Sequence, residues 1–124
     1  MIKVIREKIS AAELAALCLA HFETMVKFVI DIGTGTMAVG GEMHADAEAL
    51  LLQQGSRQGD LWGGNFYPWN APETRVEFTS FINIRPSDDN AAMEVLDPGM
   101  RVKIVALAER FLLGSNEEMP GAAP

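Results

Sequence analysis

Residues 40–67 read GGEMHADAEALLLQQGSRQGDLWGGNFY, and the fold that we predict for the chain is arranged around them. Residues 43–54 have the Ala, Glu and Leu composition of a helix, and Gly55 follows them as a left-handed cap. After a polar turn, residues 61–67 are rich in aromatic side chains and predict a strand, in which two adjacent glycines favour a bulge or a close backbone approach. The stretch therefore joins a central helix to a strand.

Upstream of this stretch the pattern predicts a strand, a helix and a hairpin. Residues 2–5 form a short apolar strand, and a helix begins at Ser10, whose hydroxyl can cap its first turn. Residues 25–32 alternate as a strand does, and a Gly-Thr-Gly turn permits a tight reversal into a second strand over residues 36–39.

Downstream, residues 75–85 alternate regularly between core-facing and mixed side chains, and they predict the cleanest strand in the chain. Asp97 and Pro98 are typical of a helix N-cap and first helical position, and Gly114 is expected to end that helix. Residues 114–124 are small, polar and rich in Pro and Gly, so they are expected to form a flexible tail.

The order of these elements predicts an α+β fold. A mainly antiparallel sheet of about five strands packs against about three helices. With 124 residues and 48% hydrophobic content, the chain suffices for one core and is short for two. We therefore expect a single domain over residues 1–113.

Composition excludes several classes of function. Ten Lys and Arg against seventeen Asp and Glu give a net charge of -7 without a basic cluster, so no nucleic-acid partner is expected. No apolar run is long enough for a membrane span, and Glu13 interrupts the Ala-rich N-terminal run that imitates a signal peptide. A single cysteine, Cys18, fits the reducing cytoplasm, although it could pair between chains.

The residues Glu42, His44, Asp46 and Glu48 form the first candidate site. In a strand all four would share one face and could bind a metal; in the helix that we favour, only His44 and Glu48 stack one turn apart. A carboxylate beside a histidine is the smallest acid-base unit, so we take His44, Glu48 and Glu42 as catalytic candidates. The alternative is an ordinary surface pair with acids that favour the helix dipole.

A second candidate group is expected on two paired strands and could form a shelf for an anionic or planar ligand. Arginine can bind a carboxylate with two hydrogen bonds, and aromatic rings can stack on a planar ligand. In the alternative, the aromatic residues fill the core and the arginine pairs with an acid. The group comprises Trp62, Asn65, Tyr67, Asn83 and Arg85.

Two other motifs are set aside. The sequence DIGTGT at residues 31–36 imitates the phosphate loop of actin-like and sugar-kinase-like ATPases. Because the chain has no room for the two lobes of those proteins, a hairpin turn is expected instead. No GxSxG elbow is present, and Cys18 falls on an apolar helix face. The sequence indicates neither a cofactor nor the identity of a metal.

Three segments carry a resemblance to a known family: GGEMHADAEALLLQQGSRQGDLWGGNFYP, VEFTSFINIRP and MVKFVIDI. Over residues 1–113 the chain resembles an uncharacterised family of small prokaryotic proteins, which is classed only as a domain of unknown function. The resemblance implies a stand-alone cytoplasmic domain and carries no activity to transfer. The chain departs from the family pattern at SDDNAAM, where a loop rich in Gly, Asn, Ser and Arg is expected, and at its Gly-Thr-Gly turn.

Two functional hypotheses follow. In the first, the domain binds a small polar or anionic ligand and can hydrolyse it, with the helix that carries His44 facing the strands across a pocket. In the second, it is a non-catalytic homodimer that buries exposed aromatics such as Trp69 and Phe81. The sequence leaves open whether the protein is an enzyme.

Overall fold

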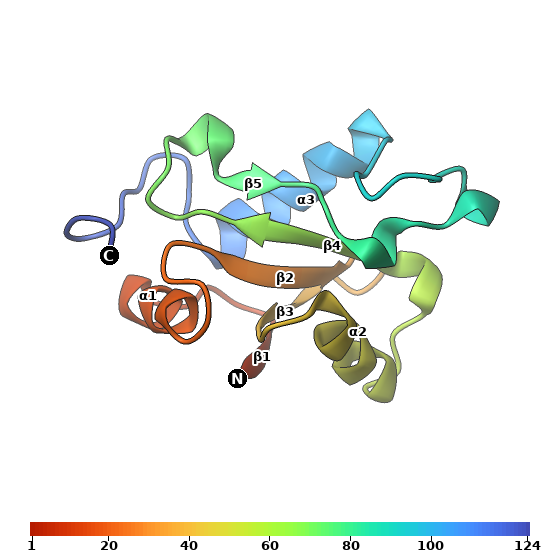
Figure 1. The fold of residues 1–124 in the computed structure, drawn as a ribbon, viewed down its shortest axis with the longest axis horizontal. Coiled ribbons are helices and arrows are strands. Elements are labelled where there is room, and N and C mark those ends of the chain that lie inside the picture. The colour runs from red at the N-terminus through yellow and green to blue at the C-terminus, as the bar shows by residue number, and fades with distance from the viewer.

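The computed structural model describes residues 1–124 and contains one antiparallel five-stranded sheet (Figure 1). The strands lie in the order β1-β3-β2-β4-β5, so that β2 is central and each neighbouring pair is antiparallel. Together with three helices, this sheet confirms the α+β prediction. The strand bounds are β1 (Ile2–Ile5), β2 (Val26–Asp31), β3 (Thr36–Gly40), β4 (Leu61–Phe66) and β5 (Val76–Glu77).

Helices α1 (Ala11–Leu19) and α3 (Pro98–Phe111) pack on one face of the sheet and form the larger core cluster with it. Each begins at the cap that the sequence predicts: Ser10 Oγ accepts a hydrogen bond from Glu13 N at 3.1 Å, and Asp97 Oδ1 accepts one from Gly99 N at 3.0 Å. In Figure 1, α3 passes behind β4 and β5. The core contains Leu14, Leu17, Cys18, Phe28, Ile30, Trp62, Phe66, Ile104 and Phe111.

Helix α2 (His44–Gln53) covers the opposite face through a smaller apolar cluster. Ala47 and Leu51, one turn apart on this helix, pack against Val29, Ala38 and Leu61 of the sheet. The helix ends before Gly55, whose φ of +99° is the left-handed conformation expected from the sequence. Because β2 lies between two covered faces, it is buried along nearly its whole length.

The turn between β2 and β3 is the predicted hairpin, and a buried carboxylate organises it. Asp31 Oδ1 accepts hydrogen bonds from Gly33 N at 2.8 Å and Thr34 N at 3.0 Å. Asp31 Oδ2 accepts another from Ser56 Oγ at 2.6 Å, which ties the hairpin to the segment that follows α2. The Gly-Thr-Gly turn therefore has a structural role within the hairpin.

The prediction of a long strand over residues 75–85 is wrong. The strand β5 contains two residues, and the chain then enters a 3-10 turn, η3 (Phe81–Asn83), whose start is capped by Ser80 Oγ accepting from Ile82 N at 3.2 Å. Side-chain hydrogen bonds to the backbone compete here with strand pairing. Asn83 therefore lies in a turn instead of on the strand face that was expected for it.

The C-terminal residues lie against the body of the domain. Arg75 is buried, and its guanidinium donates to Asn70 O at 3.1 Å, Gly114 O at 3.0 Å and Glu117 O at 2.7 Å. Met119 is also buried. The flexibility expected for residues 114–124 stays a prediction, and these contacts make it testable.

None of the helices combines the length and the apolar character that a membrane span requires.

Candidate functional site

His44 stands at the first position of α2 and points its ring at strand β4. Its side chain is 9% exposed, and Nε2 lies 2.7 Å from Gly64 O. A carbonyl oxygen can only accept a hydrogen bond, so Nε2 carries the proton. Burial lowers the pKa of His44 below its ordinary value, although the bond to Gly64 opposes this shift. Near neutral pH the ring is therefore uncharged, and Nδ1 is a hydrogen-bond acceptor.

Nδ1 of His44 makes no close hydrogen bond within the fold, and besides Gly64 O the ring interacts with the Asn65 side chain, which raises its pKa. The ring lines a hollow of about 200 Å³ between the start of α2 and the segment that follows β5. An uncapped acceptor in a hollow is available to a ligand or to a water molecule. The walls are formed by Lys27, Glu42, Met43, His44, Ala45, Ser80, Phe81 and Ile82.

Ser80 belongs to this site, and sequence reasoning missed it. A Cβ atom built on Gly63 would lie 2.8 Å from Ser80 Oγ and 3.2 Å from His44 Cδ2, so both side chains close over this glycine. In the alternation of residues 75–85, Ser80 falls at a core-facing position, so the pattern does not point to a site there. The adjacent glycines of β4 were the signal that could have found it, because they mark a close approach.

The two acidic candidates do not bond to His44. The nearest basic partner of Glu42 is His21, whose Nδ1 lies 3.6 Å from Glu42 Oε1, and the Glu42 side chain is 75% exposed. Glu48 is half-buried one turn along α2, where its charge raises the pKa of Arg85. No hydrogen bond in the structure joins His44 to Glu48. The hypothesis that the two residues form an acid-base unit therefore stays a prediction.

The side chains of Asn65 and Tyr67, at the end of β4, both contact the Glu77 carboxylate of β5. Asn65 Nδ2 donates to Glu77 Oε1 at 2.7 Å, and Tyr67 OH lies 3.3 Å from the same oxygen. Burial, then the charge of Glu77, raises the pKa of Tyr67. Asn65 Oδ1 is buried without a partner, and the Asn65 side chain is near enough to His44 to raise its pKa. Asn65 is therefore the member of the second group that acts on the pKa of the His44 ring.

Trp62 and Arg85 form a stacked pair. The Arg85 guanidinium carbon lies 3.9 Å from the centre of the Trp62 ring, and Nη1 donates to Leu61 O at 2.8 Å. Asp88 completes the arrangement, with its Oδ2 at 3.1 Å from Arg85 Nε. Burial lowers the pKa of Arg85, and Asp88 opposes this shift. These contacts match the packing and ion-pair alternative for this pair.

Asn83 has a structural position as well. It is 0% exposed, accepts from Gly63 N at 2.9 Å and donates to Gly63 O at 3.0 Å and to Met93 O at 3.0 Å. The five residues proposed as ligand-binding walls are thus divided between three places. None of the five lines the His44 hollow.

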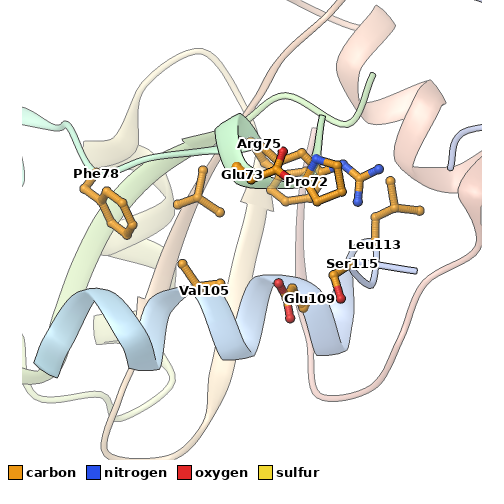
Figure 2. A pocket seen from close by; sticks show the side chains of 10 residues that line it. Pro72, Glu73, Arg75, Phe78, Val105, Glu109, Leu113 and Ser115 are labelled. Atoms are coloured by element: carbon orange, nitrogen blue, oxygen red, sulfur yellow. The ribbon is translucent and has the colours of Figure 1, made fainter. Parts of the chain in front are cut away.

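A larger hollow lies between β5 and α3 and contains none of the predicted site residues (Figure 2). Its volume is about 330 Å³, and Val76, Phe78 and Val105 form its walls. The Arg75 guanidinium at its border is directed to backbone carbonyls, and Glu73 and Glu109 stand at the rim.

No three His, Cys, Asp or Glu side chains gather closely enough to hold a metal ion. The four residues that would form a metal site on a strand are separated because His44–Gln53 is a helix. Burial raises the pKa of the Cys18 thiol to about 12, which keeps it protonated and unreactive.

Searches of curated proteins and of solved structures found no match. The family model described as protein of unknown function, DUF5674, matches residues 3–111, and the chain therefore belongs to this family.

Proposed function

We propose that the domain binds a small polar ligand in the His44 hollow. The observation that carries this proposal is the state of the His44 ring: Nε2 is held by Gly64 O at 2.7 Å, and Nδ1 is left uncapped. Binding sites typically combine apolar walls with a few fixed polar groups. Here Met43, Phe81 and Ile82 supply apolar surface around that single fixed acceptor.

The other polar groups of the hollow restrict the chemistry of the ligand. Ser80 Oγ accepts from Ile82 N, so its hydroxyl hydrogen is free to donate. Lys27 brings a positive charge to the walls, and Glu42 brings a negative one. The best match is a small molecule with an N–H or O–H donor for His44 Nδ1 and an anionic or acceptor group for Lys27 and Ser80. Such a molecule must be compact, since the volume of about 200 Å³ is below the usual range for drug-sized ligands.

A hydrolytic step would depend on His44 alone as its base. A neutral imidazole with a free Nδ1 can take a proton from a bound water molecule, and Lys27 can stabilise negative charge that develops on the substrate. Glu42 and Glu48 are not bonded to the ring, so they give this step no orienting carboxylate. Binding is therefore the better supported part of the proposal.

The test is a search for ligands by nuclear magnetic resonance, with hydroxy acids and amino acids of about ten heavy atoms or fewer as probes. A true ligand should shift the amide signals of His44, Ser80 and Ile82. Ala45→Trp, which fills the hollow from an exposed position, should abolish these shifts. Ala49→Trp is the matched control, because Ala49 is exposed on the same helix and does not line the hollow. Equal losses in both variants, or no shift with any probe, would contradict the proposal.

The homodimer remains a second candidate because large apolar side chains stand exposed at the rim of the hollow. Phe81 is 77% exposed and Met43 is 58% exposed. Trp69 does not join them, since it is partly buried against the core. Sedimentation at micromolar concentration tests this candidate: self-association that Phe81→Ser abolishes and Val102→Ser leaves intact would support it. A monomer at every concentration would exclude it.

A further inference from the structure

A polar hollow lies where the β2–β3 turn meets the ends of α2 and α3. Its volume is about 380 Å³. Most of its surface comes from side chains that can form hydrogen bonds, which distinguishes it from the apolar hollow beside β5. It is lined by Arg6, Thr34, Gly35, Thr36, Leu51, Gln54, Ser56, Arg110 and Phe111.

The positive charges of its two arginines, Arg6 and Arg110, are not paired with acidic side chains. Neither Arg6 nor Arg110 forms an ion pair, although the chain has seventeen acidic side chains for ten basic ones. Lys3 and Lys8, on either side of Arg6 in the sequence, are both paired with glutamates. In an acidic protein, two unpaired guanidinium groups at one hollow concentrate positive potential there.

The arginines are also not used to cap the neighbouring helices. The carbonyl of Leu51 at the end of α2 accepts from Gln54 N at 3.0 Å and Ser56 N at 3.0 Å. The carbonyl of Ala108 near the end of α3 accepts from Leu112 N at 2.8 Å. Backbone groups therefore satisfy these helix ends, and neither guanidinium donates a hydrogen bond within the fold. Their donors remain available to a ligand.

The glycine turn itself cannot cradle an anion. The amides of Gly33 and Thr34 already donate to Asp31 Oδ1, and Gly35 N donates to Asp31 O at 2.9 Å. Ser56 Oγ donates to Asp31 Oδ2, so its hydrogen is used as well. Binding must therefore take place on the arginine side, through side chains.

The Gln54 amide is the neutral group of the hollow that can assist the arginines. Thr34 Oγ1 and Thr36 Oγ1 lie 2.9 Å apart, and only one of them can donate in that bond. The Thr34 side chain also hydrogen-bonds the Asp31 carboxylate, where it helps to lower the pKa, so both hydroxyls are bonded within the fold. The Gln54 amide at the rim offers two further hydrogens. The donors that face the hollow thus outnumber its acceptors, and the strongest are charged.

From this arrangement we propose that the hollow binds a small oxyanion, such as a phosphate or carboxylate group, between Arg6 and Arg110. Guanidinium groups match the oxygen spacing of these anions and form hydrogen bonds about twice as strong as neutral ones. The site is separate from the His44 hollow and shares no lining residue with it. It does not depend on the ligand proposed there.

The experiment is a titration of the amide signals with sodium phosphate and, separately, with sodium citrate, at constant ionic strength adjusted with sodium chloride. We expect saturable shifts at Thr34, Gly35 and Ser56. Tighter binding of phosphate would assign a phosphate-bearing ligand, and tighter binding of citrate a carboxylate. Shifts that do not saturate by about 10 mM of either anion, or that chloride reproduces, would overturn the proposal.

Variants locate the site. Arg6→Gln and Arg110→Gln should each weaken binding about tenfold or more, because each removes charge-assisted hydrogen bonds from an exposed side chain. Lys103→Gln is the matched control: it removes the same charge from α3, at an exposed residue outside the hollow. Equal weakening in the control would show a general charge effect and overturn the site. Ala45→Trp, which blocks the other hollow, should leave phosphate binding unchanged.

Discussion

Asp31 shows how a single residue can hold several elements together. It is buried at the end of β2, and its carboxylate accepts hydrogen bonds from two turn amides and from Ser56 after α2. Burial by itself would raise the pKa of Asp31, but the hydrogen bonds outweigh it and hold the pKa below its ordinary value. The folded state therefore prefers the ionised carboxylate.

This preference predicts a dependence of stability on pH. A carboxyl group whose pKa is lower in the folded state contributes stability above its unfolded pKa, and this contribution is lost as the pH falls through the folded pKa. Asp31→Asn should therefore lower the free energy of unfolding at pH 7 by about 2 kcal/mol, with a difference from the parent that shrinks in acid. Urea unfolding between pH 7 and pH 3 measures it. Asp89→Asn, which removes an exposed carboxylate, should give no such trend.

At the scale of one residue, the sequence predicted the local hydrogen bonds and missed the distant ones. Ser10 and Asp97 cap helices a few residues away, and both were predicted because their partners lie within the same turn. The partner of His44, the Gly64 carbonyl, lies twenty residues away on another element. Spacing along α2 suggested Glu48 as the partner, because spacing contains no information about the strand that approaches the ring.

At the scale of elements, β4 is the strand on which the site is built, and its glycines permit close packing on both faces. A Cβ atom on Gly64 would lie 2.6 Å from Phe28 Cζ and 2.8 Å from Glu77 O. The second of these atoms belongs to the backbone of β5, so it cannot rotate away. On the other face, the absence of a side chain at Gly63 lets Ser80 and His44 pack closely against the strand.

Gly64→Ala should therefore lower the free energy of unfolding by about 1–3 kcal/mol, because the new methyl group overpacks β4 against β5. Thermal unfolding measures this loss. Gly59→Ala is the matched control, since a Cβ atom there meets nothing within 4 Å. An equal loss at Gly59 would show that the effect comes from the glycine backbone and not from the close approach.

The failed strand prediction also belongs to this scale. Core-facing and mixed side chains alternate over residues 75–85 as they do in a strand. A segment forms a strand, however, only where a neighbouring strand pairs with it. Strand β4 ends its pairing with β5 after Asn65 and Phe66, and Ser80 and Asn83 then bond to backbone groups. Alternation predicts which side chains can share a face, whereas these side-chain bonds depend on contacts far apart in sequence.

For the whole molecule, the fold class, the three helices and the β2–β3 hairpin were predictable because each follows from local periodicity and turn residues. The resemblance to a family of unknown function is likewise confirmed over residues 3–111. The arrangement of the hollows was not predictable. Each hollow is lined by segments that lie far apart along the chain, such as Arg6 and Arg110.

The contacts of the C-terminal residues predict that part of the tail stabilises the domain. Removing residues 114–124 would take two backbone acceptors from the buried Arg75 and expose the core beneath Met119. We expect the free energy of unfolding to fall by about 2–4 kcal/mol in urea. Removing only residues 120–124, which keeps every one of these contacts, should change it little. Equal stability of the two shortened chains would instead favour a flexible tail.

The outer edge of β4 is closed by a side chain where strand β5 stops. The Asn83 amide occupies both the N–H and the C=O of Gly63, at 2.9 Å and 3.0 Å. An incoming strand would need these same two groups in order to extend the sheet. A strand that adds to this edge would first have to displace Asn83. The Asn83 side chain therefore protects the folded protein against edge-to-edge pairing at Gly63. A partner that approaches this edge must therefore be recognised by side chains such as Phe81 and not by backbone pairing.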